Sequence, residues 1–266
     1  MTQKISAVIV FNDEHDHIEE CIRRIRFCDE IVIININKKK LDLDLQREQI
    51  KVFSHKWVPY AEQVRAFAIQ KATYDWILLT DPDLYYPYSI ETSLRSLIIE
   101  YDNTGLAIVQ IPYRNFFGKE PLKYGRKSTI SSFVGLINRN RVTIDGLIHH
   151  RGIKIKEDCF ELGVVKSLTG CIQHHWINKI SDAYKKAHRY MPYEGESRYQ
   201  VTGKYNFRKS LREIVKTIFY DLQNKAFLDK KSFQVMVFNC WYVIAANFEW
   251  YKYSSSKKPL ESEMKE

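Results

Sequence analysis

Four short, predominantly apolar runs constrain how the first 80 residues can fold. They cover residues 5–11, 31–36, 50–53 and 76–80. Continuous rather than alternating apolar runs are typical of parallel strands that are covered on both faces. Between them, apolar residues recur at three- and four-residue steps over 18–28 and 61–72, as in helices packed by one face. This order predicts an α/β fold with a doubly wound, mostly parallel sheet, whose ligand lies at the carboxyl ends of the strands.

The charge of the chain is concentrated after residue 198. Lys and Arg number 41 against 32 Asp and Glu, a net charge of +9. Residues 198–231 hold nine of the basic residues and only three acidic ones, and an aromatic-rich segment over 241–253 follows. Basic helices with aromatic side chains are what an anionic membrane surface attracts. The alternative is that these helices pack onto the preceding part of the chain or onto a second subunit of a homo-oligomer.

The cysteines indicate a reducing compartment. The chain has five, an odd number without a C-x-x-C pair, which favours neither a disulfide framework nor a zinc ribbon. Its apolar runs are shorter than the ~20 residues that a membrane-spanning helix needs, and the first run lacks a signal-peptide cleavage site. We therefore expect a cytoplasmic protein, peripheral on the inner face of the cell membrane.

The segment Asp81-Pro82-Asp83 directly follows the apolar run 76–80. Two carboxylates one residue apart at the end of a strand can share Mn²⁺ or Mg²⁺, and such a cation can hold a diphosphate. The alternative is a simple turn, because Asp and Pro are favoured turn residues. The place at the carboxyl end of a parallel strand favours the metal site.

Several segments together resemble glycosyltransferase family 2, with its GT-A fold, and especially the branch that builds lipopolysaccharide cores and other lipid-linked surface glycans. The matching pieces are ISAVIVFNDEHDHIEECI, DEIVIIN, YAEQVRAFAIQKATYDWILLTDPD, RNFFGKEPLKYG, DGLIHH and HHWINKISDAYKKAHRYMPYEGE. The third piece is the most specific. The resemblance implies that Asp81 and Asp83 hold the cation and the sugar-nucleotide diphosphate. It also implies that Gln63 and Arg65 face the nucleotide.

Arg65 has an independent reason to bind a donor, because a guanidinium forks onto phosphate oxygens; a solvated helix face is the alternative. Asn35 stands where the family's second strand usually ends in an Asp that holds the uridine. With it we expect Phe11 and Asn12 to line the donor site. Arg114, at the start of RNFFG, is expected to neutralise donor phosphate.

Where the family often reads V-H-E, this chain reads Ile148-His149-His150. A histidine thus replaces the Glu that could be the catalytic base, and the sequence leaves more than one candidate for that base. Asp145 and His150 are the first candidates, followed by Glu157 and Asp158, since carboxylate and imidazole can both accept a proton from the acceptor hydroxyl. His149 and Tyr113 are expected to bind the acceptor. Adjacent histidines on a strand point to opposite faces, so one of the pair at 174–175, His174, is expected to supplement the metal ligands.

The sequence therefore predicts a metal-dependent, inverting hexosyltransferase that moves a sugar from a nucleotide diphosphate donor, a UDP-sugar, to a lipid-linked glycan in cell-surface polysaccharide biosynthesis. Its catalytic domain would cover residues 1–200, a helical basic extension 201–253, and a disordered tail 254–266. A nucleotidyltransferase of similar fold would need a Gly-rich basic loop where this chain reads FNDEHDH. A non-catalytic membrane- or nucleic-acid-binding protein leaves Asp81-Pro82-Asp83 unexplained, and no nucleic acid partner is expected.

Overall fold

The computed structural model describes residues 3–12, 17–37, 41, 48–101, 103–149, 151–163 and 170–257. The chain forms two compact units, Met1–Leu122 with Lys127–Asn178, and Lys123–Arg126 with Lys179–Glu266. The division thus follows residue 178, whereas the sequence analysis placed it at residue 200. The reason is that helix α4 (Ile180–Thr202) packs against the later helix α6 (Lys230–Ser256) and so belongs to the second unit.

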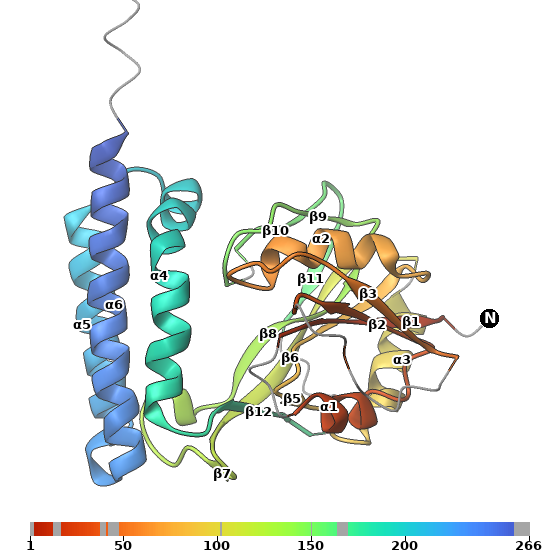
Figure 1. Cartoon of the computed structure of the whole chain (residues 1–266), viewed down its shortest axis with the longest axis horizontal. Helices are drawn as coiled ribbons and strands as arrows, with labels where there is room; N and C mark the ends of the chain where they lie inside the picture. The colour runs from red at the N-terminus through yellow and green to blue at the C-terminus, as the bar shows by residue number, and fades with distance from the viewer. Residues whose placement is uncertain are drawn as a thin grey trace, which may run out of the picture. The chain divides into compact units, whose positions relative to one another are not determined.

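The first unit is built on four parallel strands. They are β1 (Ile5–Phe11), β2 (Glu30–Asn35), β3 (Ile50–Ser54) and β4 (Trp76–Thr80), in the order β3-β2-β1-β4. Figure 1 labels the first three of these strands. Phe11 pairs with Asn35 and Ile9 with Thr80. The carboxyl ends of β1, β2 and β4 therefore meet at one edge of the sheet, as the sequence predicts.

Helices cover both faces of this sheet. On one face, α1 (Ile18–Arg24) and α3 (Ile90–Tyr101) share a core cluster with strand residues such as Leu78. On the other, α2 (Glu62–Lys71) packs Val64 against Leu79. Burial from both sides explains why β1, β2 and β4 are apolar at most positions, whereas β3 lies at the edge of the sheet and has exposed residues. The predicted α/β fold class with a doubly wound sheet is confirmed.

The rest of the sheet is mixed. Strand β8 (Ser131–Asn138) runs antiparallel between β4 and β6 (Leu106–Phe117). Beyond β6 lie β12 (Ile172–Ile177), parallel to it, and β5 (Leu84–Tyr85), antiparallel to β12. The shorter elements of this part are β7 (Glu120–Pro121), η1 (Arg126–Ser128), β9 (Val142–Ile144), β10 (Ile153–Ile155) and β11 (Phe160–Leu162). This arrangement brings Asp83, next to β5, alongside the strands that follow residue 106.

The second unit is a bundle of α4, α5 (Phe207–Gln223) and α6, with the short helix η2 (Ala226–Leu228) before α6. Both α4 and α5 pack against α6 (Figure 1). The predicted helical, basic C-terminal extension is confirmed, although α6 continues to Ser256, into the segment expected to be a disordered tail. Residues 258–266 of that tail lie outside the described residues. Within the described part of the chain, no helix combines the length and the apolarity needed to cross a bilayer.

A buried carboxylate fastens the amino-terminal end of the sheet, opposite the carboxyl edge. Glu30 accepts hydrogen bonds from Ser6 Oγ (2.6 Å), Thr73 N (2.7 Å), Thr73 Oγ1 (2.7 Å) and Lys51 Nζ (2.6 Å). Burial raises the pKa of the Glu30 carboxyl, but the hydrogen bonds from Lys51, Ser6 and Thr73 outweigh it and lower that pKa to about 2. Three segments of the first unit are thus joined through one ionised group.

We expect Glu30→Gln to lower the free energy of unfolding by roughly 1–3 kcal/mol, because it removes the charge from several charge-assisted hydrogen bonds. The native pKa of about 2 lies below the ordinary pKa of a glutamate carboxyl, about 4.3, so this stabilisation is complete above that pH and is lost as the pH falls through about 2. Urea denaturation of both proteins across this range measures the difference. A difference that stays constant down to pH 2 would contradict the assignment.

Candidate active site

The site begins where β4 ends. Asp81, Pro82 and Asp83 form a tight turn in which Leu84 N donates to Asp81 O at 3.1 Å. The Asp81 side chain is 38% exposed and the Asp83 side chain 6%. The turn that the sequence offered as an alternative is therefore present, and it directs two carboxylates of different burial to the carboxyl edge of the sheet.

Arg65 on α2 lies beneath the first of these carboxylates. Its side chain is only 4% exposed, and Nη2 lies 2.9 Å from Asp81 Oδ1. The alternative interpretation of Arg65 as part of a solvated helix face is wrong. The structure instead provides a buried cation that orients Asp81 and offsets its charge.

The second carboxylate faces an oriented histidine. His174 Nε2 on β12 lies 3.6 Å from Asp83 Oδ2, and its Nδ1 lies 2.9 Å from Asn115 Oδ1 on β6. Asn115 is buried, and its Nδ2 donates to Lys127 O at 3.0 Å. Because the Asn115 oxygen must accept, His174 Nδ1 carries a proton, and Nε2 is the ring nitrogen that faces Asp83.

This pair fits a divalent cation. An unprotonated imidazole nitrogen and a carboxylate oxygen are both electron-pair donors, so their approach is favourable when a proton or a cation lies between them. Within the part of the chain that the structure describes, no three His, Cys, Asp or Glu side chains gather as a ready metal cluster. The predicted ligand set is thus brought together as the pair Asp83 and His174, while Asp81 binds Arg65. Further ligands would have to come from the donor phosphates and water.

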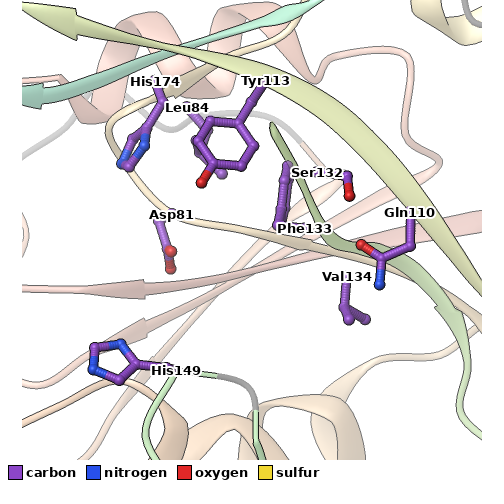
Figure 2. Close-up of a pocket in the computed structure, with 9 residues that line it drawn as sticks. All are labelled: Asp81, Leu84, Gln110, Tyr113, Ser132, Phe133, Val134, His149 and His174. Atoms are coloured by element: carbon purple, nitrogen blue, oxygen red, sulfur yellow. The ribbon is translucent and has the colours of Figure 1, made fainter. Parts of the chain in front are cut away.

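A cavity of about 450 Å³ opens beside these residues. It is lined by Asp81, Leu84, Gln110, Tyr113, Ser132, Phe133, Val134, His149 and His174. Figure 2 shows the Asp81 carboxylate, the His174 ring and the Tyr113 hydroxyl converging on it, with His149 on another side and Ser132 and Phe133 on the wall formed by β8. The cavity therefore combines polar groups with the aromatic surfaces that suit a sugar ring.

The residues expected to bind the donor base lie at the ends of β1 and β2. Asn35 is buried, and its Oδ1 accepts a hydrogen bond from Asn37 N at 3.0 Å. The Phe11 side chain belongs to the core, so only its backbone reaches the edge, where its carbonyl accepts from Ile36 N. Asn12 Oδ1 is buried and accepts no hydrogen bond from any described residue. None of these three lines the cavity.

Two further donor residues lie apart from the cavity. Gln63 is exposed at the start of α2, beside Gly146, where an added Cβ would lie 3.7 Å from Gln63 Cα. Arg114 is exposed on β6, whereas its neighbours Tyr113 and Asn115 face the cavity and His174. Because strand side chains alternate, Arg114 lies on the opposite face of the sheet. The structure does not bring Arg114 to the site.

The predicted bases lie in the loop between β9 and β10 and in the turn after it. Asp145 Oδ2 lies 3.0 Å from Lys154 Nζ, and its carboxylate fills the space where a Cβ at Gly152 would lie. Neither Asp145 nor the exposed Glu157 and Asp158 line the cavity, and His150 lies outside the described residues. His149 does line it, with a φ of 57°, in the left-handed region.

Sequence reasoning did not single out the β6 and β8 side chains that complete the cavity, nor Asn115 as the partner of His174. The cavity residues are Gln110, Ser132, Phe133 and Val134. Their signal is weak because a register shift follows Val109 in the pairing of β6 with β8, which breaks the strict alternation of side chains. Asn115 stands within the RNFFG segment, but only the pairing of β6 with β12 places it opposite His174.

Comparisons with known proteins give likeness in structure alone. No model of a protein family matches the sequence, and no curated protein is significantly similar to it. Similar solved structures include S. aureus TarS 1–349, at 10% identity and a TM-score of 0.45, covering 97% of this chain and 93% of that chain. The complex of the same S. aureus TarS fragment with UDP-GlcNAc is 11% identical, with a TM-score of 0.46, and the match covers 96% of this chain and 91% of that chain. The longer S. aureus TarS chain is 10% identical, with a TM-score of 0.47, and the match covers 96% of this chain and 55% of that chain. At this level of superposition the likeness carries no inference about activity.

Proposed function

We propose that the chain is a metal-dependent, inverting glycosyltransferase of the GT-A type, related to family 2, that uses a UDP-sugar. The observation that carries this proposal is the convergence of Arg65–Asp81 and Asp83–His174 beside the cavity at the carboxyl edge of the sheet. An α/β sheet places its ligands at that edge. The paired carboxylates are of the residue type that holds Mn²⁺ or Mg²⁺.

Charge balance governs donor binding. A diphosphate brought beside Asp81 and Asp83 meets two negative groups, of which Arg65 offsets one. Asp83 and His174 would hold the cation, which on binding offsets the charge that develops on the departing diphosphate. Asn35 and the buried Asn12 Oδ1 provide hydrogen-bonding groups for the nucleoside at the ends of β1 and β2.

The acceptor would enter over β6 and β8. Tyr113 and Phe133, whose rings meet edge to face with centroids 5.8 Å apart, offer apolar surface to a sugar ring. Ser132 and Gln110 offer hydrogen bonds. His149 is the group that would take the proton of the acceptor hydroxyl while its oxygen bonds to the anomeric carbon and the bond to the diphosphate breaks. The acceptor is proposed to be a lipid-linked glycan of the cell surface.

Thermal denaturation with nucleotide sugars tests this proposal. We expect UDP-sugars with Mn²⁺ to raise the melting temperature by roughly 5–10 °C at about 100 times the dissociation constant, because a ligand that binds only the folded state stabilises it. The shift should shrink when EDTA replaces Mn²⁺. If no nucleotide diphosphate sugar shifts the transition with or without Mn²⁺, the proposal is wrong.

The variant Arg65→Gln tests whether the donor binds at the proposed site. It should weaken donor binding by roughly 1–3 kcal/mol, because it removes the charge beside Asp81. Arg23→Gln is the matched control, since Arg23 also pairs with a carboxylate, that of Glu20, but on the surface of α1. Equal dissociation constants for the two variants by calorimetry would exclude Arg65 from the donor site.

A further inference from the structure

Helix α5 turns its polar face inward and its apolar face outward. Its buried residues are Ser210, Thr217 and Asp221. The exposed apolar residues recur at steps of three or four and are between 38% and 68% exposed: Phe207, Leu211, Val215, Ile218, Phe219 and Leu222. Phe227 and Leu228 of η2 continue the exposed apolar surface. A helix of a soluble bundle normally buries its apolar stripe, so this reversal calls for a partner.

Charge is divided between the same two faces. Of the two acidic residues of α5, Asp221 is buried and accepts from Asn239 Nδ2 at 3.1 Å, and the half-buried Glu213 pairs with Arg198 of α4. The basic residues Arg208, Lys209, Arg212 and Lys216 are all exposed. On a helical wheel they lie beside and between the apolar side chains. The outward surface of α5 is therefore apolar and positive, and the one partly exposed carboxylate of the helix, Glu213, is paired with Arg198.

The aromatic segment 241–253 is less suited to this role than the sequence suggested. Trp250 is buried and donates to Gly203 O at 3.0 Å, Trp241 packs against Tyr184 with ring centroids 5.0 Å apart, and the Tyr242 hydroxyl bonds Glu194. These side chains hold the bundle together. The large exposed apolar groups of the segment are Ile244, Phe248 and Tyr251.

We infer that α5 is an interfacial helix that lies in the plane of an anionic lipid surface, with its apolar stripe among the acyl chains and its basic residues at the headgroups. At 17 residues it extends about 25 Å, a length suited to lying in the interface. Charge complementarity selects lipid over a second copy of this chain. A two-fold dimer would bring the same positive patches together, whereas anionic headgroups neutralise them.

Vesicle cosedimentation tests this inference without any nucleotide sugar, so its outcome is independent of the proposed transferase activity. The full chain is expected to bind vesicles that contain phosphatidylglycerol and not vesicles of phosphatidylcholine alone. The charge variant Arg208→Gln/Arg212→Gln/Lys216→Gln should bind about a hundredfold more weakly, since each basic residue contributes roughly fivefold near an anionic surface. The apolar variant Leu211→Ser/Phe219→Ser should lose the binding that persists at high salt.

The control variants remove the same kinds of side chain, apolar or basic, at exposed positions outside α5. Ile99→Ser takes away an apolar side chain that is 62% exposed on α3, and Lys56→Gln/Lys119→Gln/Lys185→Gln makes the same change in net charge at exposed positions. Both should bind as the unmodified protein does. Equal binding by all variants, or no binding by the unmodified chain, would overturn the inference. So would a dimer in sedimentation velocity that only the α5 variants dissociate, because a second copy would then be the partner.

Discussion

Replacing Asp83 by asparagine is expected to abolish sugar transfer, with a loss of more than about 10³ in turnover, while the protein stays folded. Asn has nearly the same shape, so the turn after β4 and the backbone bond from His175 N to Asp83 O, 2.8 Å long, can persist. What is lost is the charged oxygen facing His174. The measurement is turnover of a UDP-sugar with Mn²⁺, after circular dichroism has confirmed folding.

Calorimetric titration with Mn²⁺ in the presence of UDP, whose phosphates supply the remaining ligands, separates metal binding from catalysis. We expect Asp83→Asn to lose the heat of binding, and Asn115→Ala to weaken it, because Asn115 holds the proton of His174 on Nδ1. Asp75→Asn is the matched control, since Asp75 is a surface carboxylate that pairs with Arg139. Retained turnover in Asp83→Asn, or full activity of the unmodified protein in EDTA, would remove the cation from the mechanism.

The parallel half of the fold was predictable because a strand that is buried on both faces has an apolar sequence, which can be recognised without knowing its neighbours in the sheet. Each of β1, β2 and β4 is buried along its whole length, so its sequence is apolar at most positions and its end is sharply marked. Asp81 and Asp83 follow such an end directly, and the metal-site hypothesis needed nothing more than that position. Strands β8 and β12 are only half buried and carry polar side chains, so their sequences resemble loops.

The parts of the site that depend on pairing between distant segments could not be predicted. Whether His174 or His175 faces Asp83 depends on the register of β12 against β6, which also sets Asn115 opposite His174. His175 instead stacks on Phe116, with ring centroids 5.0 Å apart, and burial lowers its pKa, aided by nearby His17. The choice of His174 in the sequence analysis rested on alternation and a resemblance, and neither specifies its tautomer.

The identity of the base depends on the loop between β9 and β10, where the structure separates candidates that are close in sequence. We expect His149→Gln to lower turnover by ~10²–10⁴ with donor affinity unchanged, because Gln can hydrogen-bond the acceptor hydroxyl but cannot take its proton. Asp145→Asn should lower turnover less than about tenfold. Its carboxylate is engaged by Lys154 and accepts from Leu147 N at 3.4 Å, which makes it a support of the loop that carries His149.

Lys154→Gln is the control for that supporting role, since it breaks the same ion pair without touching a possible base. If Asp145 only positions the loop, the two variants should have similar turnover and similar KM for the acceptor. If Asp145→Asn instead loses ~10²–10⁴ while Lys154→Gln does not, the carboxylate is the base. His150→Gln belongs in the same series, because His150 stays a predicted base. A loss confined to that variant would move the proton acceptor one residue along the chain and leave His149 to bind the acceptor, as the sequence first suggested.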